Sequence, residues 1–133
     1  MFGEHLLVCP KLVVPENDKN IWNVNCTFPK ADNWYNWYSK NPFRSHSKQV
    51  NLEIPDSEQG IWIRGGAILP ILQHTDEMSI LHALGNDITL EIYPDKDDSA
   101  QGHLYMDDGQ TFAHEKRCEK IYNRYHFVGG TLS

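Results

Sequence analysis

Positive charge and long apolar runs are both scarce in this sequence. Its 133 residues hold 12 Lys and Arg against 18 Asp and Glu, which gives a formal net charge of -6. Such a chain lacks the basic surface that neutralises phosphates, so we expect neither nucleic acids nor anionic membrane surfaces as partners. No apolar stretch approaches the roughly 18 residues of a membrane-spanning helix, so we expect no membrane span. A neutral ligand is easier to accommodate.

Cysteine is scarce as well, and its spacing excludes the usual frameworks. Cys9, Cys26 and Cys118 are odd in number and widely separated, without a C-x-x-C pair. Neither a set of several disulfides nor a zinc site is indicated, although one pair could form and leave one thiol free.

One triplet in the sequence bears on the cellular compartment of the chain. Asn25-Cys26-Thr27 is an N-glycosylation sequon, so Asn25 is a candidate glycosylation site if the chain enters the secretory pathway. Met1 is not followed by a basic segment and a long apolar run, so no signal peptide is visible. We expect any targeting signal to lie outside these residues.

Local catalytic and metal-binding motifs are missing. There is no G-x-S-x-G, no Walker-type loop and no H-E-x-x-H. The acidic run 95–99 begins like a calcium loop, but Ala100 replaces the glycine of the sharp turn and Met106 replaces the bidentate glutamate. His114 and Cys118 would share one face of a helix, yet two ligands are too few for zinc. We therefore expect no metal and no cofactor, and a solvated loop at 95–99.

Asp107 and Asp108 are the most tempting pair of carboxylates. Glycosidases use two carboxylates that flank the scissile bond, so the pair is chemically suitable. However, Asp108-Gly109 before Thr111 is also what a turn between two strands requires. We favour the turn, and a hydrolase that uses Asp107 or Asp108 by itself is the weaker alternative.

Alternating apolar and polar residues predict an all-β fold. Leu6–Cys9 is apolar throughout, which is typical of a strand covered on both faces, and Pro10 should end it. The patterns at 50–54 and 88–92 are those of half-buried antiparallel strands, and 121–127 is predicted as a further strand. No long amphipathic helix is visible.

The run from Gly60 to Pro70 is the most informative stretch. Ile61 and Ile63 should lie on one face of a strand, opposite Trp62 and Arg64. Two glycines interrupt this strand, and a second apolar strand follows that Pro70 should end.

Aromatic residues are concentrated at Asn33-Trp-Tyr-Asn-Trp-Tyr38. Their rings could stack on sugar faces, which makes Trp34, Trp37 and Trp62 candidate sugar-facing residues. The alternative is that they pack on the two sides of a strand and form a core, as large aromatics usually do.

Several motifs in a fixed order now resemble one enzyme family. The chain looks like the C-terminal part of a glycoside hydrolase family 31 enzyme, and within that family it most resembles glucosidase II α subunits, which are neutral α-glucosidases. The motifs are FGEHLLVCP at 2–10, WYNWY at 34–38, IP at 54–55, IRGGAILP at 63–70 and GHLYMDDGQTF at 102–112. The family usually has aspartate where Asn36 stands, so a charge is lost but an acceptor is kept.

The resemblance implies a domain plan. The family's (β/α)8 barrel is followed by a proximal and a distal β-sandwich, both antiparallel. We expect 1–12 to be a remnant of the last barrel strand, 13–72 the proximal sandwich, 73–85 a connector, and 86–133 the start of an incomplete distal sandwich. A chain that opens on a barrel strand would lack its parallel neighbours, so we expect Met1 not to be the natural start.

The resemblance also implies a function that this chain serves without performing. The family's nucleophile lies in a W-x-D-M-N-E type motif that is absent here, so no catalytic residue is carried over. The implied partners are the catalytic barrel of the same parent chain, an oligosaccharide substrate and a lectin-like β subunit. The implied setting is N-glycan processing in the endoplasmic reticulum lumen. The alternative is a free-standing carbohydrate-binding or interaction module that uses Trp34 to Tyr38.

Overall fold

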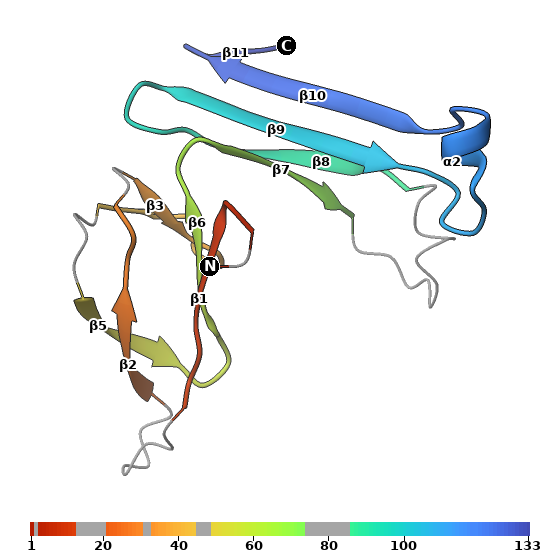
Figure 1. Ribbon diagram of the computed structural model, residues 1–133. Coiled ribbons are helices and arrows are strands. Elements are labelled where there is room, and N and C mark those ends of the chain that lie inside the picture. The colour runs from red at the N-terminus through yellow and green to blue at the C-terminus, as the bar shows by residue number, and fades with distance from the viewer. Residues whose placement is uncertain (2, 13–20, 31–32, 45–48, 74–85) are drawn as a thin grey trace. The chain divides into compact units, whose positions relative to one another are not determined.

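The computed structural model describes residues 1, 3–12, 21–30, 33–44, 49–73 and 86–133 (Figure 1). It is nearly all β, as the alternating sequence predicts. The chain divides into two compact units, one of Met1–Ala67 with Tyr93–Asp97 and one of Ile68–Ile92 with Asp98–Ser133.

The first unit contains two antiparallel sheets. A four-stranded sheet has the order β1-β6-β3-β4, and a two-stranded sheet pairs β2 with β5. The strands are β1 (Leu6–Cys9), β2 (Ile21–Thr27), β3 (Trp34–Asn36), β4 (Pro42–Phe43), β5 (Gln49–Pro55) and β6 (Gly60–Arg64).

A single core joins these two sheets. Alternation on β2 and β5 turns apolar residues inward and leaves polar ones exposed, as predicted for 50–54. Phe28 lies at the centre, 1% exposed, with its ring 5.1 to 5.5 Å from those of Trp34, Phe43 and Trp62. The buried cluster consists of Leu7, Cys9, Val24, Cys26, Phe28, Trp34, Ile54 and Trp62.

The second unit is built on a five-stranded sheet with the order β11-β10-β9-β7-β8. Its longest pairing joins β9 to β10, from Met106 opposite Ile121 to Ser99 opposite Val128. The elements are β7 (Ala67–Leu72), β8 (Ile88–Tyr93), β9 (Ser99–Met106), α2 (Ala113–Lys116), β10 (Ile121–Val128) and β11 (Thr131–Leu132). Large side chains of β10 and β11 are exposed, among them Val128 at 64% and Ile121 at 53%.

The first strand differs from its prediction. β1 pairs antiparallel with β6, from Leu6 opposite Ile63 to Cys9 opposite Gly60, and it is the edge strand of its sheet. Leu7 and Cys9 are buried, but Val8 is 46% exposed. The expectation of a strand covered on both faces is therefore wrong at Val8, because β1 lies at the edge of the sheet that it forms with β6. The assignment of 1–12 as a remnant of the last barrel strand stays a prediction. β1 does end before Pro10, as predicted.

The boundary between the compact units follows shortly after β6. β6 and β7 are separated by only Gly65 and Gly66, yet they lie in different sheets. The division into compact units falls after Ala67. Of the predicted connector 73–85, residues 74–85 lie outside the described residues, so the predicted domain ranges stay predictions. Residues 93–97 belong to the first unit, although they lie within the range 86–133 that was predicted for the distal sandwich.

Pro70 does not end its strand. β7 continues to Leu72, because the fixed φ of proline is compatible with an extended chain and only one N–H donor is lost. The positive φ of 91° at Gly66 supplies the turn that separates β6 from β7.

Candidate functional site

The aromatic segment forms core rather than surface. Trp34 is 0% exposed and Trp62 is 9% exposed, and each packs its ring against Phe28. The indole Nε1 atoms of Trp34 and Trp62 are buried without a hydrogen-bond partner among the described residues. Their assignment as sugar-facing aromatics is therefore wrong, because an enclosed ring presents no face to a ligand. The alternative of a free-standing carbohydrate-binding module loses its main platform.

Trp37 lies in the turn after β3 and is half-buried. The Lys40 ammonium lies 4.9 Å from its ring centroid, and the same Nζ donates a hydrogen bond of 3.0 Å to the Tyr93 hydroxyl. A sugar that stacked on the same face of the indole would have to displace this cation, an interaction of about 0.5–1 kcal/mol at an exposed site. The role of Trp37 in sugar contact stays a prediction.

Asn36 organises this turn. Its Oδ1 accepts hydrogen bonds from the backbone N–H groups of Tyr38 at 2.9 Å and Ser39 at 2.8 Å. Its backbone carbonyl accepts one from Lys40, which adopts a positive φ of 59°. Asparagine thus supplies the acceptor that an aspartate would, as the sequence comparison suggested.

Replacing Asn36 with alanine should loosen this turn by about 1 kcal/mol, because two backbone N–H groups lose their acceptor. Asn36→Asp keeps both bonds, so the stability of its turn should stay within a few tenths of a kcal/mol of that of the unchanged protein. Amide hydrogen exchange at Tyr38 and Ser39 in the full-length protein measures the difference. Equal protection in Asn36→Ala and the unchanged protein would rule out this role.

A hollow of about 150 Å³ lies beside this turn within the first unit, bordered by residues that include Asn36, Glu53, Glu58, Gln59 and Trp62. Small-molecule sites usually have volumes of roughly 300–1,000 Å³, so this hollow is smaller than such a site. Its two carboxylates were not singled out by any sequence motif. We assign no binding role to it.

Asp107 forms a turn, as predicted. One of its carboxylate oxygens accepts the backbone N–H of Gly109 at 2.9 Å, and the other accepts the Tyr105 hydroxyl at 2.8 Å. These two bonds lower the pKa of Asp107, and the bond from Gly109 has the larger effect. The bond to Asp107 raises the pKa of Tyr105. His114 Nδ1 lies 3.6 Å from the same carboxylate.

Asp108 completes the turn in the same way. It accepts hydrogen bonds from the Thr111 hydroxyl, from the Thr111 N–H at 3.0 Å and from the Gln110 N–H at 3.2 Å. These bonds, led by that from the Thr111 hydroxyl, lower the pKa of Asp108. The general acid of a glycosidase needs a raised pKa, so neither aspartate has the environment of that acid.

The suggested metal ligands are not assembled. Asp95 Oδ1 accepts the backbone N–H of Asp97 at 2.9 Å, which is a local turn. α2 ends at Lys116, so Cys118 lies beyond the helix on which it would have met His114. Across the described ranges, no group of three or more His, Cys, Asp or Glu is placed to hold a metal ion.

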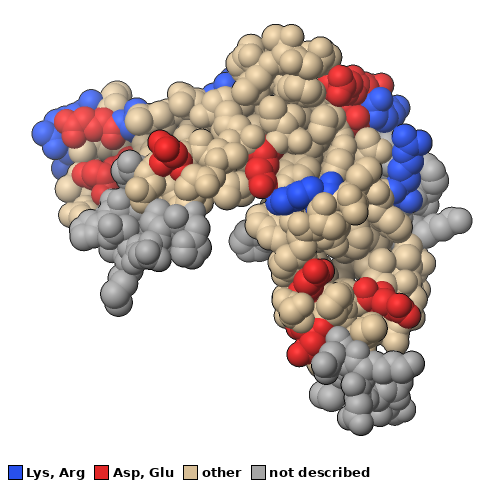
Figure 2. Space-filling model, turned by 180° about the vertical axis from the view of Figure 1, so that it is seen from behind, with Lys and Arg blue, Asp and Glu red and all other residues tan. Residues whose placement is uncertain are grey.

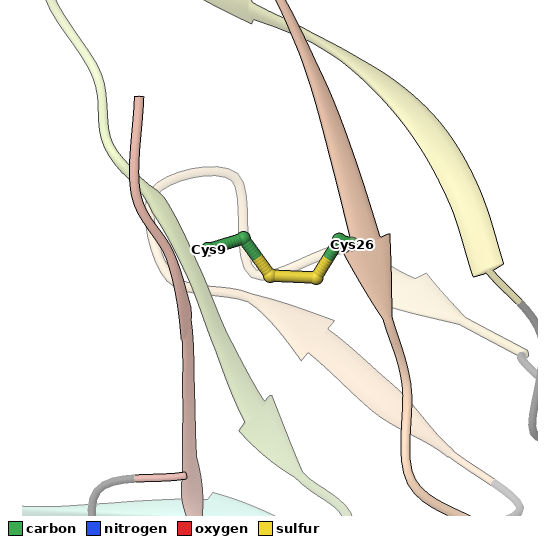
Figure 3. Close-up of a disulfide and its surroundings, with 2 residues drawn as sticks. All are labelled: Cys9 and Cys26. Carbon is green, nitrogen blue, oxygen red and sulfur yellow. A yellow bond between two sulfur atoms is a disulfide. The ribbon is translucent and has the colours of Figure 1, made fainter. Parts of the chain in front are cut away.

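Cys9 and Cys26 form a disulfide that ties β1 to β2 and hence the two sheets of the first unit together (Figure 3). The bridge closes a separation of 17 residues, which in chain-entropy terms stabilises the fold by about 3 kcal/mol. Cys118 is free and exposed. The prediction that one pair could form and leave one thiol free is confirmed.

The surface carries charges of both signs. On the face drawn in Figure 2, Lys and Arg lie close to Asp and Glu, and no continuous basic area is visible over the coloured residues. In the part of the chain that the structure describes, no helix is long and apolar enough to cross a membrane. Asn25 is exposed on β2, directly before the buried Cys26.

Comparisons with known proteins agree on one family. Residues 1–69 match the family model described as "Glycosyl hydrolase family 31 C-terminal domain". An α-glucosidase of Schizosaccharomyces pombe is 35% identical over 82% of this chain, and neutral α-glucosidase AB of Homo sapiens is 30% identical over 97%. These alignments cover 11% and 14% of the two relatives, so the chain spans only a small part of their length.

Solved structures give the same picture. A crystal structure of a glucosidase II α subunit superposes with a TM-score of 0.75 at 25% identity, covering 96% of this chain and 13% of that one. A second, with a TM-score of 0.76 at 25% identity and the same coverage, is an ER glucosidase II heterodimer of a catalytic subunit and the binding domain of a regulatory subunit.

Proposed function

Because this chain belongs to glycoside hydrolase family 31, we propose that it is the C-terminal β-sandwich part of an α-glucosidase and that it supports the catalytic barrel without cleaving substrate itself. The observation that carries the proposal is the family match over residues 1–69. The hydrogen bonding of Asp107 and Asp108 supports the second half, because both carboxylates are committed to a turn and have lowered pKa values.

The supporting role follows from how the first unit is built. Its aromatic core and its disulfide make a stiff sandwich, which suits a part that holds neighbouring elements in place. In this proposal the first unit is the proximal sandwich, and the five-stranded sheet begins the distal one. Arg64, exposed at the end of β6, is the side chain that we propose contacts the barrel.

For the whole protein we propose hydrolysis of α-linked glucose with retention of configuration. In that reaction one carboxylate attacks the sugar and a second protonates the leaving group. Both would lie in the barrel, outside these residues. The likeness to neutral α-glucosidase AB and to glucosidase II α subunits supports glucose trimming of N-glycans as the specific activity.

The compartment we propose is the endoplasmic reticulum lumen. Disulfides form and persist in oxidising compartments, and Cys9–Cys26 is one. We further propose a lectin-like β subunit as a partner, since one of the similar structures is a catalytic subunit with the binding domain of a regulatory subunit.

The test uses the full-length protein that contains this chain and the chain by itself. The full-length protein should hydrolyse a chromogenic α-glucoside and release the α-anomer first, while the matched β-glucoside should not react. The isolated chain should give no turnover above the blank. Cleavage of only the β-glucoside, or turnover by the isolated chain, would contradict the proposal.

A further inference from the structure

We propose that Asn25 carries an N-linked oligosaccharide and that its attachment competes with formation of the Cys9–Cys26 disulfide. The sequon and the disulfide share Cys26, so both reactions need the same short segment in an accessible state. The inference rests on the proposed luminal compartment, and the experiment below separates the two.

The position of Asn25 suits a large modification. Along β2 the exposed and buried residues alternate, so Asn23, Asn25 and Thr27 share the outer face while Cys26 points into the core at 2% exposure. The facing strand β5 presents Gln49, Asn51 and Glu53 on the same side, all exposed. A glycan on Asn25 would project from this polar, exposed sheet face and would not disturb the core.

The folded unit cannot be the substrate for attachment. In the structure Asn25 is paired with Asn51, and the β2–β5 ladder runs through the whole sequon. A glycosyltransferase that binds the backbone on both sides of the asparagine cannot do so while β2 is hydrogen-bonded to β5. Attachment therefore precedes the pairing of β2 with β5.

Chain synthesis provides that interval. β5 begins at Gln49 and β6, the partner of β1, begins at Gly60, so both are made after the sequon. At about 5–20 residues per second, the sequon waits about a second or more for its sheet partners. Cys9 and Cys26 are both made before β5, so the disulfide needs neither strand to form.

The disulfide must also form early. Cys9 is 5% exposed and Cys26 is 2% exposed in the folded unit, so no oxidising protein can reach either sulfur once the sandwich is complete. When the bond forms first, it ties the central residue of the sequon to β1. The tether restrains Asn25 and Thr27 before the transferase can act, which makes the two reactions compete.

The chemistry of each reaction is complete with ordinary luminal reagents. The Asn25 side-chain nitrogen forms a bond to the anomeric carbon of an oligosaccharide, the bond from that carbon to its lipid diphosphate carrier breaks, and the amide loses one proton. In the competing reaction the thiols of Cys9 and Cys26 pass two electrons and two protons to the disulfide of an oxidoreductase, which becomes a dithiol.

The test compares site occupancy in variants of the full-length protein, produced in eukaryotic cells with its own N-terminal sequence and, separately, behind a strong heterologous secretion signal. Tryptic cleavage after Lys19 and Lys30 isolates residues 20–30, which hold both Asn25 and Cys26. Mass spectrometry of that peptide reports the glycan and, without reduction, the link to the Cys9 peptide.

Cys9→Ser is the decisive variant, because it removes the disulfide and leaves the sequon unchanged. Occupancy of Asn25 should rise about twofold, since disulfide formation on a scale of seconds no longer limits the interval. Cys118→Ser removes a thiol outside the disulfide and should leave occupancy unchanged. Ile54→Ala weakens the same core but keeps both thiols, so its occupancy should rise less than that of Cys9→Ser.

The remaining outcomes are also decisive. Equal occupancy in Cys9→Ser and the unchanged luminal protein, or an equal rise in Ile54→Ala, would overturn the competition. An empty Asn25 in every luminal variant would overturn the site. The protein with its own N-terminal sequence could stay outside the lumen while the version with the secretion signal shows higher Asn25 occupancy in Cys9→Ser. That result would contradict the proposed compartment and support the competition.

Discussion

Replacing Trp34 with alanine is expected to destabilise the first unit by about 3–5 kcal/mol, the usual cost of removing a fully buried large aromatic side chain. The indole is 0% exposed and makes an edge-to-face contact of 5.5 Å with Phe28, so its loss leaves a cavity at the centre of the core. The core cannot close over this cavity easily because the disulfide holds β1 and β2 in place.

Hydrogen exchange of the β2, β3, β5 and β6 amides in the full-length protein measures this loss. Trp34→Phe is the matched control: it keeps an aromatic ring against Phe28 and removes a buried Nε1 that has no partner among the described residues. It should cost clearly less than the alanine variant. If both variants exchange as slowly as the unchanged protein, Trp34 does not support the core.

Replacing Gly102 with alanine is expected to destabilise the five-stranded sheet by about 3 kcal/mol, which is at the upper end of the usual cost of overpacking a well-packed site. A Cβ at Gly102 would overlap the backbone carbonyl oxygen of Ile68 on β7 and lie 2.9 Å from the Ile68 Cβ. Backbone atoms in a neighbouring strand cannot move aside as a flexible side chain can. Glycine is needed here for the close approach of two strands.

The readout for Gly102 is exchange of the β7 and β9 amides. Gln101→Ala, at the adjacent exposed position on β9, should leave those amides protected. Protection in Gly102→Ala that matches the Gln101→Ala control would mean that β7 and β9 are less closely packed than the structure indicates.

Local chemistry made much of this fold predictable. Alternation at 50–54 and 88–92 predicted β5 and β8, because the side chains of a strand point to its two faces in turn. The Asp108-Gly109 pair predicted the turn after β9 because its hydrogen bonds join residues only two or three apart. Such features depend on neighbours in the sequence.

Features that depend on distant residues were not predictable. Four apolar residues at Leu6–Cys9 do not reveal whether the strand lies at a sheet edge, since that depends on its pairing with β6. Three cysteines allow three pairings, and the fold selects one by bringing the Cα atoms of Cys9 and Cys26 to 5.7 Å. The short helix α2 was missed because its four residues carry no periodic pattern.

The candidate site likewise combines features that local sequence predicts with features that depend on distant residues. Alternation placed Trp34 and Trp62 on strands but could not tell which face was the core. Phe28 is the deciding neighbour, because it packs against both indoles. Tyr93 lies far along the chain from Lys40, and no local pattern could have linked its hydroxyl to that side chain.

The most direct test of the central claim is the steady-state kinetics of the full-length enzyme with Asp107→Asn and Asp108→Asn combined. Asparagine keeps an acceptor oxygen at both turn positions and removes both charges. We predict kcat and KM for an α-glucoside within about twofold of the unchanged enzyme, because these carboxylates build a turn and do not act on substrate. A fall in kcat of about a thousandfold or more in correctly folded protein, the scale for a lost catalytic group, would contradict the account.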